Sequence, residues 1–152
     1  MIVSHKHKFI FFKPWKVGGN SVEHNLIEQC GDGDIIDTTH RNPSDTLDIV
    51  GEKIYKQYFK FTISRNPWDR MVSLYEYCSA GGRANELWVG CDFRTFCRKF
   101  KANRLLVHTQ HSFKGEIYSA HLLKQHECIS KEIDFVLRYE NLSGHFKDVP
   151  NR

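Results

Sequence analysis

The sequence lacks the features that mark several classes of protein. Across its 152 residues there is no apolar run near the roughly 18 residues that a membrane span requires. The apolar stretch at residues 9–12 is too short for the core of a signal peptide, so we expect a cytoplasmic protein. Proline is sparse, and no repeat, low-complexity tract or linker appears. These absences exclude collagen and disordered tails, and they predict one continuous domain over residues 1–152.

Cysteine and charge narrow the choice further. Five Cys residues stand at irregular positions without paired C-x-x-C spacing, which argues against both a disulfide framework and a zinc site. Lys and Arg outnumber Asp and Glu by 22 to 18, giving a formal net charge of +4. Because this excess is mild and dispersed along the chain, we expect an anionic ligand but no nucleic-acid partner.

Short apolar runs alternate with helical patterns along much of the chain. Four runs predict strands, at residues 8–13, 34–38, 58–64 and 134–138. Apolar residues at helical spacing follow each of the first three runs. The second and third of these helices each begin with an Asn-Pro pair, a capping residue before a proline, and the second is expected to reach Ile54. The alternation predicts an α/β fold, a parallel sheet flanked by crossover helices.

The stretch between the third and fourth predicted strands is less regular. Residues 78–90 and 107–116 are predicted as loops. Asp92 is expected to cap a helix that carries several phenylalanines on one face, and a further helix is expected around residues 118–127.

Polar segments follow the first three predicted strands, at residues 16–21, 38–42 and 64–69. In open parallel α/β sheets, ligands bind beyond the carboxyl ends of the strands. We therefore expect these three segments to meet and form a site.

The first of these segments, K-V-G-G-N-S at residues 16–21, is a glycine turn that opens a helix. Its two glycines let backbone N–H groups approach a ligand closely, and the helix dipole favours negative charge there. Lys16 adds a mobile positive charge. The order of residues in this segment differs from that of the GxxxxGK[ST] phosphate loop. The pattern therefore predicts either an anion-binding loop or a plain strand-to-helix turn with a surface lysine.

A second cationic group follows the third strand. Arg65 ends that strand, and Ser73 lies about two helical turns beyond the Asn66 cap, on the same face as the cap. A guanidinium fork and a hydroxyl suit a phosphate group. The alternative is that Arg65 pairs with a nearby acid such as Asp69, while Ser73 only packs in the helix.

Three blocks of the sequence carry a more specific signal. Residues 16–21 read KVGGNS, residues 61–75 read FTISRNPWDRMVSLY, and residues 134–142 read DFVLRYENL. In this order they resemble the K-x-G-G-x-S loop, the R-N-P-x-D-R-x-V-S-x-Y motif and the D-F-V-x-R-x-E-N-L block of sulfotransferases, especially the Golgi-type carbohydrate enzymes. The resemblance implies the sulfotransferase fold, a P-loop-like α/β fold with a parallel sheet flanked by helices, and transfer of a sulfuryl group.

The same resemblance implies a donor, 3′-phosphoadenosine 5′-phosphosulfate, and no metal. Lys16 would neutralise charge on the leaving phosphate oxygen, and Arg65 and Ser73 would hold the 3′-phosphate. Protein cations can supply this electrostatic work. The loop expected to hold the 5′-phosphosulfate consists of Lys16, Val17, Gly18, Gly19, Asn20 and Ser21.

The attacking hydroxyl or amine must lose a proton, so a base is expected within reach. His40 follows the second predicted strand, and its type of side chain titrates near neutral pH. Several carbohydrate sulfotransferases place a histidine base in this region, which His40 resembles. Asp37 or Asp45 would be the local carboxylate substitutes, and Gln110 is a candidate for facing the acceptor.

The sequence therefore predicts a sulfotransferase that acts on a hydroxyl or amine acceptor, with a carbohydrate as the favoured acceptor class. The alternative is a non-catalytic module that binds the nucleotide or a sulfated glycan. A nucleotide kinase is disfavoured, because no Mg²⁺-binding carboxylate motif accompanies the loop. Relatives usually continue past the E-N-L block with further helices, so the resemblance implies either a minimal enzyme or a chain that lacks a C-terminal extension.

Overall fold

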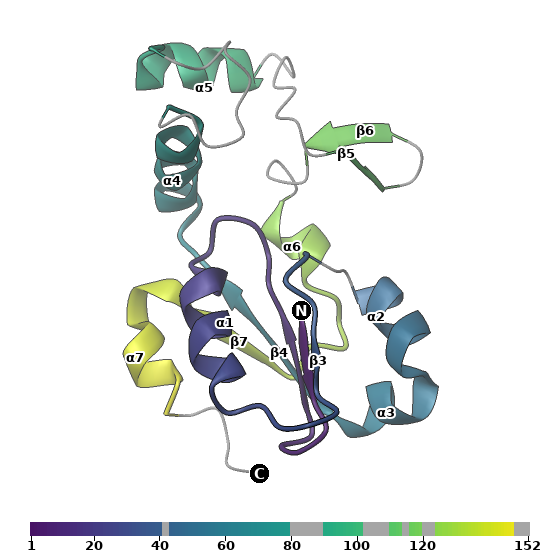
Figure 1. The fold of residues 1–152 in the computed structure, drawn as a ribbon. Helices are drawn as coiled ribbons and strands as arrows, with labels where there is room; N and C mark the ends of the chain where they lie inside the picture. The colour runs from purple at the N-terminus through teal and green to yellow at the C-terminus, as the bar shows by residue number, and fades with distance from the viewer. Residues whose placement is uncertain (41–42, 80–89, 102–109, 114–115, 120–123, 148–152) are drawn as a thin grey trace. The chain divides into compact units, whose positions relative to one another are not determined.

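The computed structural model describes residues 1–40, 43–79, 90–101, 110–113, 116–119 and 124–147 (Figure 1). These residues belong to two compact units. The first unit consists of residues 1–65 and 124–152, and the second of residues 66–123. Among the described residues, no helix combines the length and the hydrophobicity that crossing a bilayer requires.

The first unit contains a five-stranded sheet with the strand order β3-β1-β2-β4-β7. Its strands are β1 (Ile2–Ser4), β2 (Phe9–Phe12), β3 (Ile35–Ile36), β4 (Phe59–Ser64) and β7 (Phe135–Arg138). β2 pairs in parallel with β4, and β4 with β7, whereas β1 is antiparallel to both β2 and β3. β3 therefore runs in the same direction as β2. The carboxyl ends of β2, β3, β4 and β7 consequently lie at one edge of the sheet, called here the carboxyl edge.

The sheet confirms the predicted α/β fold class and adds a strand that the sequence pattern did not reveal. β1 has only three residues, too few to show a periodicity, yet its Ile2 and Val3 are fully buried. The polar turn at residues 5–8 sends the chain back antiparallel into β2, with Lys8 at a positive φ of 54°. The sheet is therefore mixed, because a hairpin with the sharp turn of residues 5–8 adds one reversed strand.

Helices cover both faces of the sheet (Figure 1). α1 (Gly19–Ile27) and α7 (Leu142–His145) pack on the face that holds Phe11 and Phe61, through Val22 and Leu26 of α1 and Leu142 of α7. α2 (Pro43–Val50) and α3 (Glu52–Gln57) pack on the other face. The unit also contains α6 (Gln125–Cys128) and the short 3₁₀ turn η3 (Tyr139–Asn141).

Alternation along β2 explains the two buried faces. Phe9 and Phe11 point to the face covered by α1, and Ile10 and Phe12 to the face covered by α3. Successive side chains of a strand point to opposite faces, so a strand buried on both sides reads as a continuous apolar run. Each fully buried Phe or Ile contributes about 1.5–3 kcal/mol through removal from water.

A hydrogen-bonded carboxylate secures the end of the sheet opposite the carboxyl edge. Asp34 Oδ2 accepts hydrogen bonds from Ser4 Oγ at 2.8 Å and from Gly31 N at 3.0 Å, and Oδ1 accepts one from His5 N at 2.6 Å. Burial raises the pKa of Asp34, but the hydrogen bonds from Gly31, Ser4, His5 and Lys6 outweigh it and lower the pKa to about 2. The ionised carboxylate thus ties β1 and its turn to the segment before β3.

The second unit contains α4 (Pro67–Ser79), α5 (Phe93–Lys101), and the antiparallel pair β5 (Gln110–Phe113) and β6 (Glu116–Ser119). Both caps predicted within this unit are confirmed, whereas the cap predicted at Asn42 lies outside the described residues. Asn66 Oδ1 accepts a hydrogen bond from Trp68 N at 2.9 Å, and Asp92 Oδ1 accepts one from Thr95 N at 2.7 Å. The buried core between α4 and α5 consists of Leu74, Cys78 and Phe96.

Three predicted elements were wrong. The helix expected to continue to Ile54 is split at Gly51, whose φ of +78° interrupts the helical backbone between α2 and α3. The predicted loop at residues 107–116 contains β5. Of the helix expected around residues 118–127, residues 118–119 end β6 and residues 125–127 lie in the short α6, whereas residues 120–123 lie outside the described residues. β5 and β6 are four-residue strands rich in polar side chains, so they lack the long apolar alternation that identifies a strand.

Candidate functional site

Four segments of the first unit follow strands that end at the carboxyl edge. Residues 13–18 follow β2, residues 37–40 follow β3, Arg65 follows β4 and Tyr139 follows β7. Direct contacts join these segments to one another. The expected convergence of polar segments is therefore found for residues 16–18, 38–40 and 64–65, whereas residues 41–42 lie outside the described residues.

The glycine loop turns the chain sharply from β2 into α1. Gly18 has a φ of +79° and a ψ of 14°, the left-handed conformation that glycine adopts without steric cost. Lys16 also has a positive φ, +60°, which costs a non-glycine residue on the order of 1 kcal/mol and is concentrated at functional sites. Fully buried Val17 anchors the turn in the core. The loop therefore holds Lys16 in a strained backbone conformation beside the positive end of the α1 dipole.

The first turn of α1 faces solvent in part. Asn20 and Ser21 are exposed, and Ser21 N donates a hydrogen bond to Gly18 O at 3.2 Å. Gly19 is buried, and a methyl group there would overlap the side chain of Lys13. Close packing against Lys13 therefore explains the second glycine, and the left-handed turn explains the first.

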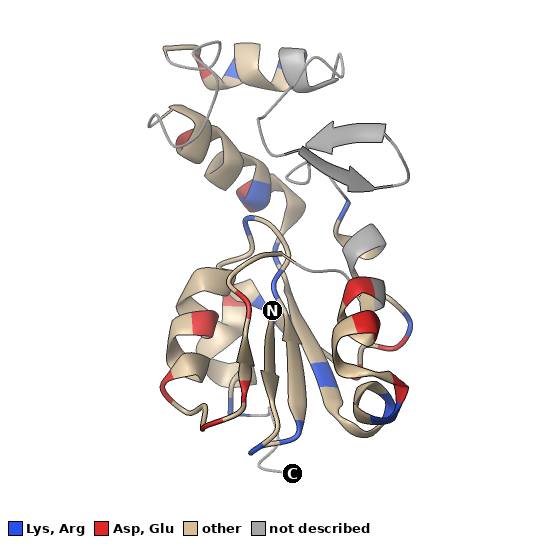
Figure 2. Cartoon of the chain, turned by 45° about the vertical axis from the view of Figure 1, so that its right-hand side comes forward, with Lys and Arg blue, Asp and Glu red and all other residues tan. Residues whose placement is uncertain are grey.

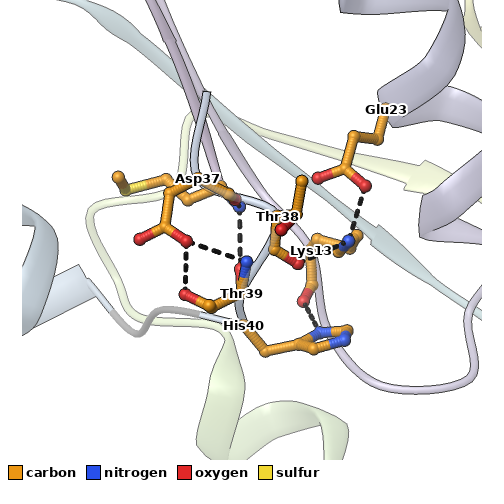
Figure 3. Close-up of polar contacts among 7 residues, drawn as sticks. Lys13, Glu23, Asp37, Thr38, Thr39 and His40 are labelled. Carbon is orange, nitrogen blue, oxygen red and sulfur yellow. Dashed lines mark hydrogen bonds and ion pairs between the residues drawn. The ribbon is translucent and has the colours of Figure 1, made fainter. Parts of the chain in front are cut away.

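A buried ion pair supports this loop, and the sequence reasoning missed it. Lys13 Nζ lies 2.6 Å from Glu23 Oε2, and both side chains are at least 90% buried. The same ammonium donates a hydrogen bond to Thr38 O at 3.0 Å (Figure 3). Lys13 thereby connects β2, α1 and the segment after β3. In the sequence, Lys13 reads only as a charge at a strand boundary, and nothing in its spacing identifies Glu23 as a partner.

His40 is held by the loop after β2. Its Nδ1 lies 2.5 Å from the carbonyl oxygen of Lys13 (Figure 3), and its ring stacks on Trp15 with 3.4 Å between ring centroids. Because a carbonyl oxygen only accepts hydrogen bonds, Nδ1 carries the proton in this contact. In the neutral ring the lone pair then resides on Nε2, the nitrogen on which a base would act.

Asp37 and Asp45, the carboxylates predicted as alternatives to His40 for the base, lie in different local settings. Asp37 Oδ1 accepts hydrogen bonds from Thr39 N at 2.8 Å and Thr39 Oγ1 at 2.5 Å (Figure 3). It therefore stabilises the turn that precedes His40. Asp45 lies in the first turn of α2.

Arg65 is fixed through both its backbone and its side chain. Gln125 Oε1 accepts a hydrogen bond from Arg65 N at 2.8 Å, and Gln125 Nε2 donates one to Arg65 O at 2.6 Å. The guanidinium carbon lies 4.2 Å from the centroid of the Tyr139 ring. Among the described residues, Arg65 Nε is buried and has no hydrogen-bond partner. A buried cationic donor without an acceptor is expensive, and an anionic oxygen would satisfy it.

Tyr139 joins the glycine loop to Arg65. A methyl group on Gly18 would overlap the Cδ2–Cε2 edge of the Tyr139 ring, so the ring packs directly against this glycine. The same ring lies under the Arg65 guanidinium, and 37% of the residue remains exposed. Neither Tyr139 nor Gln125 was identified as a site residue from the sequence. Tyr139 stands inside the third block of resemblance, whereas Gln125 has no sequence signal.

Two further predicted residues belong to the second unit. Ser73 lies on α4 and is half-buried, and its joint action with Arg65 stays a prediction. Gln110 is the first residue of β5, and its proposed contact with an acceptor also stays a prediction.

The charges at this edge suit an anionic ligand. Lys16 and Arg65 both stand there, and Gly18 leads into the amino end of α1. Over the described chain, Lys and Arg are dispersed among many segments rather than gathered in one stripe (Figure 2). Within the same residues, no group of three His, Cys, Asp or Glu side chains is arranged to hold a metal ion.

A family model described as "Sulfotransferase family" matches residues 1–151. This chain belongs to the sulfotransferase family. No curated protein and no solved structure matched it. Membership of the sulfotransferase family assigns sulfuryl transfer as the general reaction, with a sulfate-donor nucleotide as co-substrate and an acceptor substrate. The predicted fold and the sulfotransferase family are thereby confirmed, whereas the resemblance to the Golgi-type carbohydrate enzymes stays a prediction.

Proposed function

We propose that this sulfotransferase uses 3′-phosphoadenosine 5′-phosphosulfate as its donor and transfers the sulfuryl group to a hydroxyl or amine of a carbohydrate. One observation carries the proposal. The Tyr139 ring contacts both Gly18 of the glycine loop and the guanidinium of Arg65. The glycine loop at the edge of the Tyr139 ring and the Arg65 guanidinium over its face are both suited to bind an anion, which supports a ligand that carries two separate phosphate groups.

The donor site is built from residues of the first unit, with Ser73 as a further proposed contact. Residues 16–21 would hold the 5′-phosphosulfate, with backbone N–H groups at the start of α1 and the ammonium of Lys16 opposing its negative charge. Arg65 would hold the 3′-phosphate, because its buried Nε needs an acceptor. When bound, the donor supplies the sulfuryl group, whose bond to the phosphate oxygen breaks as the bond to the acceptor oxygen or nitrogen forms.

His40 and Lys16 would divide the work of charge transfer. His40 Nε2 accepts the proton that the attacking hydroxyl or amine loses, while the Lys13 carbonyl holds the opposite ring nitrogen in its protonated form. Lys16 stabilises the negative charge that develops on the leaving phosphate oxygen. No protein-bound metal is needed for this division of roles.

The direct test is a transfer assay. The purified chain is incubated with donor labelled with radioactive sulfur and a panel of glycan, phenol and peptide acceptors. We expect label to appear on a glycan. Donor binding without transfer to any acceptor would instead support a module that only binds the nucleotide, and transfer to phenols or peptides alone would correct the acceptor class.

Replacing Arg65 tests the 3′-phosphate assignment. We expect Arg65→Ala to weaken binding of adenosine 3′,5′-bisphosphate roughly 10- to 100-fold, since a hydrogen bond to a charged group is worth about 1.5–3 kcal/mol. Isothermal titration calorimetry measures this affinity. Arg94→Ala, at an exposed position on α5, is the matched control and should bind as the unaltered protein does. Unchanged affinity in Arg65→Ala would remove Arg65 from the donor site.

Replacing His40 tests the assignment of the base. We expect His40→Ala to lower the turnover rate about 10²- to 10⁴-fold while the affinity for the bisphosphate nucleotide stays the same. His24→Ala, an exposed histidine on α1, serves as the control. If turnover survives in His40→Ala, the base lies elsewhere, and Asp37→Asn and Asp45→Asn are the next variants to assay.

A further inference from the structure

The backbone of Arg65 is held by a side chain from a distant part of the sequence. The amide of Gln125 makes two hydrogen bonds to Arg65, accepting from its N–H at 2.8 Å and donating to its carbonyl at 2.6 Å. Gln125 begins α6, sixty residues later in the chain. An amide that engages both polar groups of one residue reproduces the hydrogen bonds of a neighbouring strand, so it fixes the direction in which the chain leaves β4.

The side chain of Arg65 is held separately. Its guanidinium carbon lies 4.2 Å from the centroid of Tyr139, within the range of a cation–π contact. This contact restrains the guanidinium on one face, while its N–H groups, which lie in the plane of the guanidinium itself, can still donate hydrogen bonds. Buried Nε has no partner among the described residues. The Arg65 guanidinium is therefore held in one orientation, while its Nε still lacks a hydrogen-bond acceptor among the described residues.

We propose that Gln125 and Tyr139 are positioning residues that preorganise Arg65 for the 3′-phosphate of the donor nucleotide. This inference rests on the proposed function, because it assigns Arg65 a phosphate ligand. A flexible arginine loses side-chain freedom when it binds, and a residue held in the bound orientation beforehand avoids that loss. The pair thus supplies affinity for one phosphate group without touching it.

The test compares two nucleotides that differ only in this phosphate. Adenosine 3′,5′-bisphosphate and adenosine 5′-monophosphate are titrated into the full chain, and the ratio of their dissociation constants measures the preference for the 3′-phosphate. We expect Gln125→Met to reduce this preference roughly 3- to 10-fold while leaving the affinity for the monophosphate unchanged. Gln57→Met, at an exposed position at the end of α3, is the matched control.

A second pair of variants keeps the test decisive if Gln125→Met folds poorly. Tyr139→Phe retains the aromatic ring and should keep the full preference. Tyr139→Leu removes the ring face and should reduce the preference, with added loss for both nucleotides because the ring also packs on Gly18. Rescue by Phe distinguishes stacking on Arg65 from any role of the tyrosine hydroxyl.

Each remaining outcome overturns the inference in a recognisable way. If Arg65→Ala abolishes the preference but Gln125→Met and Tyr139→Leu retain it, Arg65 binds the phosphate without help and the proposed function stands. If the variants lose affinity for both nucleotides equally and melt at lower temperature, the two residues are only structural. If the unaltered protein shows no preference for the bisphosphate, the inference and the proposed donor fall together.

Discussion

Lys13 and Glu23 support the candidate site and are not proposed to contact the ligand. Their ion pair is almost fully buried, and Glu23 Oε1 has no hydrogen-bond partner among the described residues. Burying two charges costs several kcal/mol, so such a pair adds little net stability, yet removal of one member leaves an uncompensated charge. The main role of the pair is therefore to hold the loop after β2 against the segment after β3.

We expect Glu23→Gln to lower the free energy of unfolding by about 3 kcal/mol, because it leaves the buried ammonium of Lys13 without a compensating negative charge. The double variant Lys13→Met/Glu23→Met should recover much of this loss. Urea denaturation measures both. Glu52→Gln breaks the exposed pair of Glu52 and Lys56, whose N–O distance is also 2.6 Å, and should change stability by no more than the error of measurement. If the losses of unfolding free energy in the single variants Lys13→Met and Glu23→Met add up to the loss in the double variant, the two residues do not act as a pair.

The sequence identifies the residues that would touch the ligand better than those that support them. Lys16 and Arg65 stand in short motifs next to glycine and proline, whose backbone effects are local and readable. Gln125 meets Arg65 only because β4 and the segment before β7 are adjacent in space. A contact between residues so far apart in sequence leaves no periodicity, so a single sequence does not reveal it.

At the scale of elements, the β2–α1 turn requires glycine for two separable reasons. Gly18 combines a φ of +79° with direct contact to the Tyr139 ring, whereas Gly33 has a φ of +87° and open space where a methyl group would stand, with nothing within 4 Å. Gly18 and Gly33 thus share a left-handed backbone, but only Gly18 contacts the Tyr139 ring.

We expect Gly18→Ala to abolish measurable nucleotide binding, since the methyl group displaces Tyr139 and reshapes the loop. Gly33→Ala should lose about 1 kcal/mol of stability from the left-handed backbone alone and keep its nucleotide affinity. Calorimetric titration and urea denaturation separate the two effects. Equal nucleotide affinity in both variants would show that the Tyr139 contact has no bearing on the site.

The direction of the strands could be predicted from the sequence only in part. The buried run of β2 and β4 and their following Asn-Pro or glycine turns indicate parallel crossovers, and these strands are parallel. β1 was missed because a three-residue strand has no period to detect. Even so, β3 points the same way as β2, so the polar segments gather at the same edge as they would in an entirely parallel sheet.

For the whole molecule, Asp34 makes one contribution to the dependence of stability on acid pH. Its pKa is lowered to about 2 in the folded chain, from an ordinary value near 4. A depressed pKa contributes stability that is complete above the unfolded value and is lost as the pH falls from about 4 through about 2. Because Asp34 is partly exposed, the contribution is on the order of 1 kcal/mol after screening.

We expect Asp34→Asn to be less stable than the unaltered protein at pH 7, with the difference shrinking as the pH falls below about 4. Urea denaturation at pH 7, 4.5 and 3 measures the trend. Asp32→Asn, exposed in the same turn, provides the control. A difference that stays constant with pH would mean that the carboxylate charge of Asp34 is not what stabilises the hairpin.

The strand order has a consequence for the order of folding events. β1 and β2 lie next to each other in sequence, whereas β2 pairs with β4 fifty residues away, and β4 pairs with β7 seventy-four residues away. Closing such long loops is slow, so the hairpin is expected to form early and the parallel pairings late. Arg65, Gln125 and Tyr139 meet only after those late steps. Nucleotide added to the chain should therefore slow unfolding while leaving the rate of refolding unchanged.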